Sequence, residues 1–505
     1  MPSEMLGQPQ RLHPVSLLFT LWSFVRGMIV PLIVVIFLGG GTGYEFLFAL
    51  AIVPAMIAAV VKYAFYRYRL GDDEMMVREG VLTRNERHIP YARIQNINLV
   101  QNPFHRALGV AEVHIETASG TKPEAIIRVL SLDRIDAIRE LVFRDRAQGE
   151  TVSAEGQEEG AERLLELSTR ELVLLGLISN RGMVVIAAVM GVIWQFDVWD
   201  FDWEAIAKQA ADRAPEVTER LGLVERQGLA ASILLGALLI FVGVLFMKLL
   251  SILWALFRFH GFTLDRGVRN LRARYGLLTR YTAAIPSHRI QLLSSRTTPL
   301  YRLWNRVGVL AETAGGGTGN EGEGQSETHR LWLAPILSSG RADAFNHAIL
   351  PDVDLSDATW NRLPVRARSR IRNRGFFLSA VISIATVAFL GWWSLAVLVV
   401  TFGWSALHAA MWWKHAAWTV VATAIAFRSG WWTRRTSIVR FAKIQTVSLA
   451  QTPFDRRHEM ARVSIDTAGA GKAGHKIHVP FLPHAVAVEL HERLALEAAR
   501  RSFRW

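Results

Sequence analysis

The chain has 505 residues, of which 51% are hydrophobic and 20% charged, with a mean hydropathy of +0.22. Soluble proteins carry about 25% charged residues, so this composition excludes a disordered chain and disfavours a soluble enzyme. Cysteine is absent, which excludes disulfides, iron–sulfur clusters held by cysteine, thiolate zinc sites and cysteine nucleophiles. In so hydrophobic a chain, the net charge of +13 favours contact with an anionic membrane leaflet.

Six apolar segments in three pairs predict three transmembrane helix hairpins. The first segment of each pair begins at a glycine that follows an arginine. It runs for roughly 18 residues, or ~27 Å of helix, close to the ~30 Å hydrocarbon core. The pairs are 27–44 with 46–61, 182–199 with 229–250, and 375–392 with 395–413.

Charges beside these segments predict their orientation. The connection 197–228 is acidic, with eight Asp or Glu against four Lys or Arg, whereas the opposite ends of the hairpins are basic. Positive charge near the ends of spans marks the cytoplasmic side. We therefore expect a multi-pass inner-membrane protein with cytoplasmic N- and C-termini, and with Arg26, Arg181 and Arg374 at the membrane boundary.

A segment that follows each hairpin recurs three times without a gap. Its first matched residues are Gly80, Gly276 and Gly430. An isoleucine lies 14 residues after each glycine, and a proline lies 23 residues after it. A threonine, preceded by an acidic residue and followed by an alanine, lies 37 residues after it. These residues are Ile94, Ile290 and Ile444, then Pro103, Pro299 and Pro453, then Thr117, Thr313 and Thr467. Such self-similarity indicates one structural unit present three times.

Within each copy the apolar residues follow the period of strands. Residues 77–82 are typical of a strand, a turn and a strand, with Gly80 supplying the positive φ of a tight hairpin. Segments 94–99 and 110–117 mainly alternate apolar and polar residues, as half-buried antiparallel strands do. Helices over 135–144, 341–349 and 485–499 end the copies, which predicts small barrels with a helical cap.

With these residues in view, the units resemble bacterial pleckstrin-homology-like (PH-like) domains of the membrane-associated type. The chain resembles the YdbT-like family over nearly its whole length. The likeness rests on the hairpin glycine, the Ile-Pro-x-x-Arg-Ile-Gln stretch at 89–95 and 285–291, the Pro-Phe/Leu step and the Glu-Thr-Ala end. In copy three, Val439-Arg440-Phe441 replaces the Ile-Pro start. The resemblance implies a split seven-stranded barrel, no catalysis, and envelope protection with a related membrane partner.

The expected fold is an α+β membrane protein with three transmembrane hairpins, each followed by a cytoplasmic PH-like split β-barrel capped by a C-terminal helix. The expected boundaries are 1–26 for a tail and interfacial helix, 27–66 for hairpin one, 67–147 for PH-like domain one, 148–181 for a linker and interfacial helix, 182–257 for hairpin two with the acidic external loop 197–228, 258–352 for PH-like domain two, 353–374 for a basic linker, 375–415 for hairpin three and 416–505 for PH-like domain three.

Residues repeated in all three copies are the candidates for binding a ligand or partner. Alternation along a strand places the basic residue and the glutamine of Arg/Lys-Ile-Gln on one face, opposite the isoleucine. The alternative is that both residues are structural: the glutamine holds two strands together where they cross, and the arginine only exposes its charge to solvent at the edge of a strand. The candidates are Arg93, Gln95, Arg289, Gln291, Lys443 and Gln445 from this motif, and Arg84, Arg280 and Arg434 from the Thr-Arg pairs.

Other patterns favour ordinary structure. The glycine-rich stretch 315–319 lacks the Lys-Ser/Thr of a phosphate loop, and His475 and His478 would point to opposite faces of a strand. No metal, cofactor or nucleic acid is therefore expected, since basic residues are also interleaved with acids. His408, the one ionisable group deep in its span, is thin support for a proton path.

We expect a non-enzymatic polytopic protein whose barrels form a cytoplasmic binding and assembly platform. Its expected partners are anionic lipids of the inner leaflet and a membrane protein of the same family. The alternative is a transporter or export component that uses the six-span core, with the barrels as gates. An enzyme would need a nucleophile–base pair, which the sequence does not offer. The sequence leaves homo-oligomerisation open.

Overall fold

The computed structural model of the chain describes residues 63–80, 84–91, 94–117, 125–135, 137–138, 162–179, 181–183, 228–267, 270–313, 330–467 and 477–500, with isolated positions before residue 62. Most of the first expected hairpin, most of segment 182–199, the acidic loop 197–228 and the glycine-rich stretch 315–319 lie outside these residues. The six-span arrangement therefore stays a prediction.

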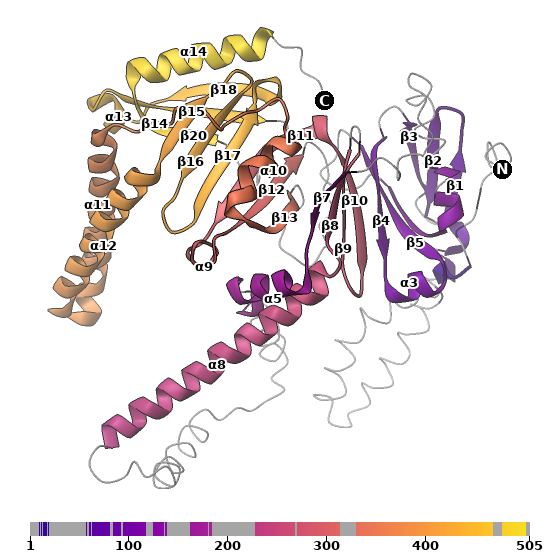
Figure 1. Cartoon of the computed structure of the whole chain (residues 1–505), viewed down its shortest axis with the longest axis horizontal. Coiled ribbons are helices and arrows are strands. Elements are labelled where there is room, and N and C mark those ends of the chain that lie inside the picture. Colours follow the sequence, from indigo (N-terminus) through magenta and orange to yellow (C-terminus); the bar gives the residue numbers. More distant parts are fainter. Residues whose placement is uncertain are drawn as a thin grey trace.

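Three similar barrels stand in a row, with copy one and copy three at opposite ends (Figure 1). Each is split into two antiparallel half-sheets, and the described strands end and begin close to the expected positions. Copy one contains β1 (Arg67–Leu70), β2 (Glu74–Glu79) and β3 (Asn85–Pro90) in its first half-sheet, and β4 (Ile94–Gln101), β5 (Val110–Thr117) and β6 (Ala125–Ser131) in its second, with the short helix α3 (Pro103–Ala107) between β4 and β5.

Copy two repeats this order. Its strands are β7 (Glu162–Glu166), β8 (Thr263–Arg266), β9 (Asn270–Tyr275) and β10 (Arg280–Pro286), then β11 (Ile290–Thr297), β12 (Arg306–Thr313) and β13 (Arg330–Ser338). A 3-10 turn, η3 (Ser287–Arg289), joins the two half-sheets, and α9 (Pro299–Leu303) corresponds to α3. The turn η4 (Ser339–Arg341) leads into the closing helix α10 (Ala342–Ile349), as expected.

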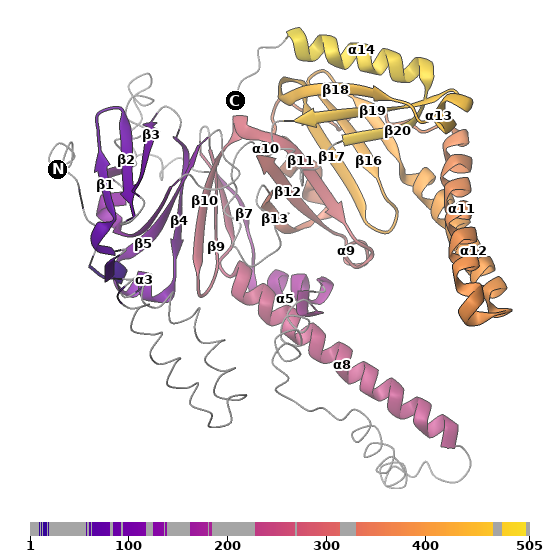
Figure 2. The ribbon, with the colours of Figure 1, turned by 180° about the vertical axis from the view of Figure 1, so that it is seen from behind.

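Copy three has β14 (Asn361–Arg362), β15 (Ala417–Val420), β16 (Ala424–Ser429) and β17 (Arg434–Arg440), then β18 (Ile444–Ala450), β19 (Met460–Thr467) and β20 (Ile477–Pro483). The turn η5 (Phe441–Lys443) and helix α13 (Pro453–Arg457) correspond to η3 and α9. The closing helix α14 (His484–Arg500) lies across β18 and β19, as Figure 2 shows from behind. Residues 484–500 thus confirm the third expected cap.

The first strand of a barrel precedes its membrane segment, which the sequence did not lead us to expect. β7 pairs with β8, although α5 (Thr169–Ile178) and α8 (Gly228–Phe259) lie between them in the chain. β14 pairs with β15 across α11 (Val365–Leu390) and α12 (Trp393–His415) in the same way. An isolated bridge between Gln10 and Tyr68 has the same form in copy one. The membrane segments are therefore inserted into the barrels, and the ranges expected as linkers, 148–181 and 353–374, each contain a barrel strand.

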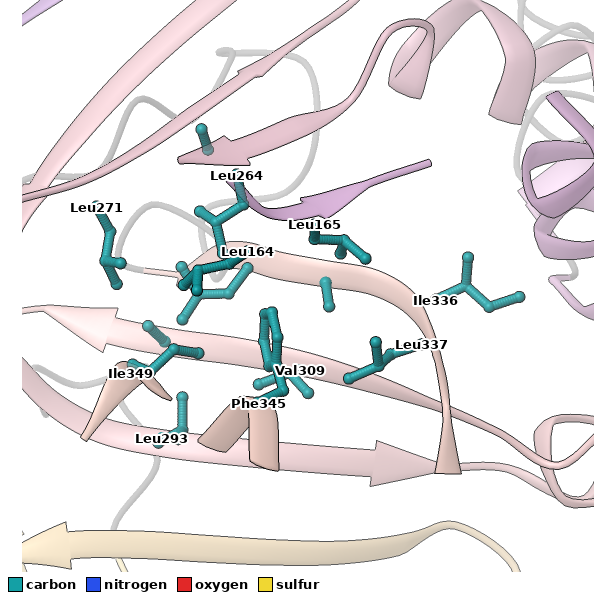
Figure 3. Packing of buried hydrophobic residues seen from close by; sticks show 14 of the residues in the cluster. Leu164, Leu165, Leu264, Leu271, Leu293, Val309, Ile336, Leu337, Phe345 and Ile349 are labelled. Atoms are coloured by element: carbon teal, nitrogen blue, oxygen red, sulfur yellow. The ribbon is translucent and has the colours of Figure 1, made fainter. Parts of the chain in front are cut away.

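The buried side chains of β7 establish that it belongs to barrel two. Leu164 and Leu165 gather with Val309 of β12 and with Phe345 and Ile349 of the closing helix α10 in one core (Figure 3). All five side chains are at most 9% exposed. Burial of this kind contributes roughly 1.5–3 kcal/mol for each large aliphatic side chain, so the strand is part of the folding unit.

Neighbouring copies are joined by main-chain pairing. β4 of copy one pairs with β10 of copy two, and β11 of copy two pairs with β17 of copy three. Two seven-stranded sheets result, in the orders β6-β5-β4-β10-β9-β8-β7 and β13-β12-β11-β17-β16-β15-β14. Each sheet contributes half of one barrel and half of the next, so the three barrels form one continuous body.

Two apolar helices leave this body with most of their surface uncovered. Among the described residues, the segments Gly236–Phe259 of α8 and Trp393–His415 are long and apolar enough to cross a membrane, and only 6% and 11% of an apolar 18-residue stretch in each are buried. The core helix of a soluble protein would be mostly covered, whereas Ile240 is 70% and Val400 is 69% exposed. Both helices project from the same side of the row (Figure 1).

Helices α11 and α12 form an antiparallel pair joined at Gly391, close to the turn expected near 392–394. The rings of Phe376 and Phe402 meet edge to face at 4.6 Å, and the Ser383 hydroxyl donates to the carbonyl of Ser394 at 2.8 Å. The arginine-rich stretch 366–374, which falls in the expected basic linker 353–374, instead belongs to the N-terminal part of the continuous helix α11.

Candidate functional site

In copies two and three, the Arg/Lys-Ile-Gln motif lies at the corner between the two half-sheets. Arg289 ends the turn η3 and Lys443 ends η5, and each is followed directly by the next strand, β11 or β18. Strand alternation fails here because the pairing of β11 with β12 shifts register between Ile290 and Leu292. Ile290, Gln291 and Leu292 are all buried, so neither Gln291 nor its neighbours on the strand face solvent in copy two.

The corners of copies two and three touch each other. The guanidinium of Arg440 donates from Nη2 to the carbonyls of Ser287 and Ile290, both at 3.1 Å. Its Nη1 lies 3.7 Å from Oδ1 of Asp352, which follows the cap of copy two. Arg440 is the residue that replaces the proline of the other two copies, so its side chain ties one copy to the next.

Lys443 is only 3% exposed, although it carries an ammonium group. Burial lowers the pKa of Lys443 to about 8, and the charges of Arg440 and Arg289 act in the same direction. Burial also lowers the pKa of Arg440, against the opposing effect of Asp352. The half-buried Arg289 and Arg440 and the buried Lys443 together form a cationic cluster, called the basic corner below.

The basic corner has the chemistry of an anion site or of a structural junction. Three cations with one nearby carboxylate favour an added phosphate or carboxylate group, because its charge would offset theirs. Gln291 is 1% exposed, and neither end of its amide has a hydrogen-bond partner among the described residues. A buried amide of this kind normally has a partner, so the corner has unused hydrogen-bonding capacity.

The arginines of the Thr-Arg pairs lie where one copy meets the next. Arg280 begins β10 and faces Gln101 of β4, while Arg434 begins β17 and faces Thr297 of β11. Nη2 of Arg434 also lies 2.6 Å from Nε2 of His415, at the end of α12. The structure therefore separates these arginines from the basic corner and puts them at the strand junctions.

The remaining candidates are not gathered into either place. Arg84 lies just before β3 and is exposed, and Gln445 is exposed on β18. Arg93 lies outside the described residues, and only the backbone of Gln95 is described, in β4.

The order of strands and the repeated corners can be compared with known proteins. The family described as "Bacterial PH domain" matches the chain three times, at residues 18–146, 220–352 and 376–498, which is more than half of its length. This chain belongs to the bacterial PH domain family. It is similar to the UPF0699 transmembrane protein YdbT of Bacillus subtilis, with 25% identity over 481 residues that cover 91% of this chain and 93% of that protein. No solved structure matches it.

The match to bacterial PH domains confirms the resemblance to YdbT-like proteins with three such domains. It also supports a membrane protein of mixed α and β structure. Each matched region after the first begins inside or just before a membrane segment rather than at the first barrel strand. This agrees with a repeat that is easiest to detect from its membrane segment onward.

One set of arginines at the junctions between these bacterial PH domains was not predicted from the sequence. Nη1 of Arg106 donates to the carbonyl of Leu277 at 3.3 Å. Nη1 and Nη2 of Arg302 donate to the carbonyls of Trp431 and Trp432, at 2.9 and 3.4 Å. Each arginine holds the hairpin turn of the next copy. Their spacing would have revealed them, because Arg106, Arg302 and Arg456 all lie 26 residues after the hairpin glycine.

The membrane end of the protein carries exposed positive charge. The guanidinium of Arg181 lies 5.4 Å from the centre of the Trp254 ring of α8, and Arg374 is exposed on α11, while Arg26 lies outside the described residues. Arg370 pairs with Asp455 of α13 at 3.4 Å. The exposed arginines of α11, called the α11 strip below, are Arg366, Arg368, Arg372 and Arg374.

The residues considered for transport and metal binding have local partners. Nδ1 of His408 accepts a hydrogen bond from the indole of Trp431 at 2.8 Å, and Nδ1 of His478 lies 2.8 Å from the hydroxyl of Ser464. His475 lies outside the described residues. Across the described ranges, His, Asp and Glu side chains form no group of three that could hold a metal ion.

Proposed function

We propose that this bacterial PH domain protein is a non-enzymatic, polytopic inner-membrane protein whose three barrels form a binding and assembly platform on the cytoplasmic leaflet. The observation that carries the proposal is the junction between membrane helix and barrel. α8 ends at Phe259 and β8 begins at Thr263, while α12 ends at His415 and β15 begins at Ala417. With so few residues between them, the barrels are held at the membrane surface.

Six spans in three hairpins, with both termini inside, fit this platform best. The pair of α11 and α12 is the pattern for the other two hairpins, because all three are inserted at the same place in a barrel sequence. The α11 strip lies between barrel three and the apolar half of its helix. Clustered arginines at that position favour the cytoplasmic side.

Binding to anionic lipid is one half of the proposed activity. Exposed Lys or Arg near an anionic leaflet contributes about 1 kcal/mol of attraction each, so the α11 strip supports preferential contact with acidic headgroups. The full-length protein purified with its native lipids, compared with an R366Q/R368Q/R372Q/R374Q variant, tests this directly. Mass spectrometry should detect fewer anionic lipids on the variant, and an unchanged lipid profile would contradict the lipid half of the proposal.

Assembly with a related membrane protein in cell-envelope protection is the other half. The three barrels meet each other through strand edges and arginines, which supports a fold that is built to join PH domains. Cells that lack the protein should become sensitive to agents that damage the envelope. A co-purifying membrane protein with a PH domain is the expected partner, and normal resistance in deleted cells would argue against the protective role.

A further inference from the structure

At each end of the row, the strand edge equivalent to those that join neighbouring copies is left unpaired among the described residues. β18 pairs only with β19 and β3 only with β2, among the described residues. In β18 the side chains of Gln445, Thr446, Ser448 and Ala450 are exposed, and Val447 and Leu449 are half-buried. An unprotected edge strand without charges is a template for pairing with another chain.

The chain itself indicates which strand fits such an edge. Within the row, the strand that follows the corner of one copy pairs with the strand that precedes the corner of the next: β4 pairs with β10, and β11 pairs with β17. The register is the same both times, since Arg280 faces Gln101 and Arg434 faces Thr297, which are equivalent positions of the repeat. β18 is the equivalent strand of copy three, and among the described residues it pairs only with β19.

The arginine that holds the next copy is also unused at this end. Arg106 and Arg302 donate to carbonyls of the following hairpin turn. Arg456 is their equivalent in copy three; it is exposed, and its side chain has no hydrogen bond or ion pair to the described residues. Copy three therefore presents both halves of a junction, the strand edge and the arginine, without an occupant.

We propose that β18 and Arg456 dock the free β3 edge of a second copy of this chain, head to tail. The repeat sets the register: Arg84 faces Gln451 and Asn85 faces Ala450 of the other molecule. β3 is the matching occupant because it is the strand of copy one that corresponds to β10 and β17, and it lies at the opposite end of the row from β18 (Figures 1 and 2). The contact is heterologous, so it generates rings or open chains of molecules.

This contact is weaker than the junctions within the chain. β3 carries Glu86 and His88 where β10 carries Thr282 and Ala284. His88 pairs with Glu74 at 3.0 Å, and Glu86 lies 4.0 Å from Arg78. These charges would lie against Leu449 and Val447, and charged edges reduce pairing. The assembly is thus reversible, whereas the internal junctions are permanent.

The absence of cysteine allows a direct test on the full-length protein in lipid nanodiscs or detergent. Purified N85C and A450C variants are mixed and oxidised, and the expected product is a disulfide-linked dimer that neither variant forms alone. The double variant V100C/Y281C, which places a pair at the equivalent internal position, is the positive control for oxidation. A T446C variant mixed with N85C is the control for register.

The outcomes separate the possible occupants. A higher yield of cross-linked product from N85C with A450C than from N85C with T446C supports the proposal. A severalfold loss of that product when Arg456 is changed to alanine supports it as well. Replacing Glu86 and His88 with Thr and Ala should raise the yield severalfold. No product while V100C/Y281C oxidises, or linkage of A450C in membranes to a different protein, overturns it. The inference extends the assembly half of the proposed function, and its failure would leave the lipid result unchanged.

Discussion

A buried lysine between two arginines makes the charge state of copy three depend on pH. The folded protein releases the Lys443 proton near pH 8, whereas an unfolded lysine keeps it to about pH 10.4. Between these values the unfolded state binds more protons, so stability rises with pH across this window. Below pH 8 the buried charge lowers stability.

We therefore expect Lys443→Met to leave the protein as stable at pH 7 or to stabilise it by up to ~1 kcal/mol, since an apolar side chain of similar volume carries no buried charge. The variant should also lose part of the rise in melting temperature between pH 8 and 10. Thermal melts over that range measure both effects. Lys414→Met, at an exposed lysine, is the control and should keep the rise.

The hairpin glycines are required by backbone geometry. Gly276 has φ of +114°, and a Cβ built on it would lie 2.0 Å from the carbonyl oxygen of Thr279. Gly276→Ala should therefore cost about 1–3 kcal/mol of unfolding free energy, measured by denaturant titration. Gly340→Ala, where a Cβ would meet nothing within 4 Å, should change stability by less than ~0.5 kcal/mol. Equal effects of the two changes would contradict this account.

At the scale of elements, a matched pair of arginines separates junctions within the chain from the open end. Arg302 donates two hydrogen bonds to the turn of copy three, while the side chain of Arg456 has no partner among the described residues. Arg302→Ala should destabilise the protein by about 1.5–3 kcal/mol, because charge-assisted hydrogen bonds are lost. Arg456→Ala should leave the melting temperature of the dilute protein unchanged. A similar loss from both would show that position 26 of the repeat stabilises each barrel internally.

Local elements could be predicted from the sequence because the signals that set them are local. Ser168 caps α5, and its hydroxyl accepts a hydrogen bond from the amide of Glu171, as the Ser-x-x-Glu pattern indicates. β5 spans the predicted 110–117 without error, since alternation decides which residues face the core. The hairpin glycines also have the predicted positive φ.

Strand partners could not be predicted in the same way. Alternation fixes the faces of a strand and says nothing about which edge it pairs with, so the pairings of β4 with β10 and of β11 with β17 had no sequence signal. β14 has two residues and β7 follows a Glu-rich stretch, so neither has a recognisable period. The basic corner was also missed, because it depends on a register shift and on contact between copies.

At the scale of the whole molecule, the insertion of membrane segments into the barrels has a topological consequence. A barrel whose first strand precedes its membrane segment and whose second strand follows it requires an even number of spans between them. With an odd number of spans, the two strands would lie on opposite sides of the membrane and could not pair. The central claim is thus that all three barrels lie on the cytoplasmic side as one joined body.

Thiol labelling of whole cells tests this claim most directly, because the chain has no cysteine of its own. The exposed residues Ala107, Ser339 and Ala485, one in each barrel, are changed singly to cysteine. A membrane-impermeant maleimide should label none of the three in intact cells and all three after the membrane is permeabilised. Labelling of any one of them in intact cells would contradict the account.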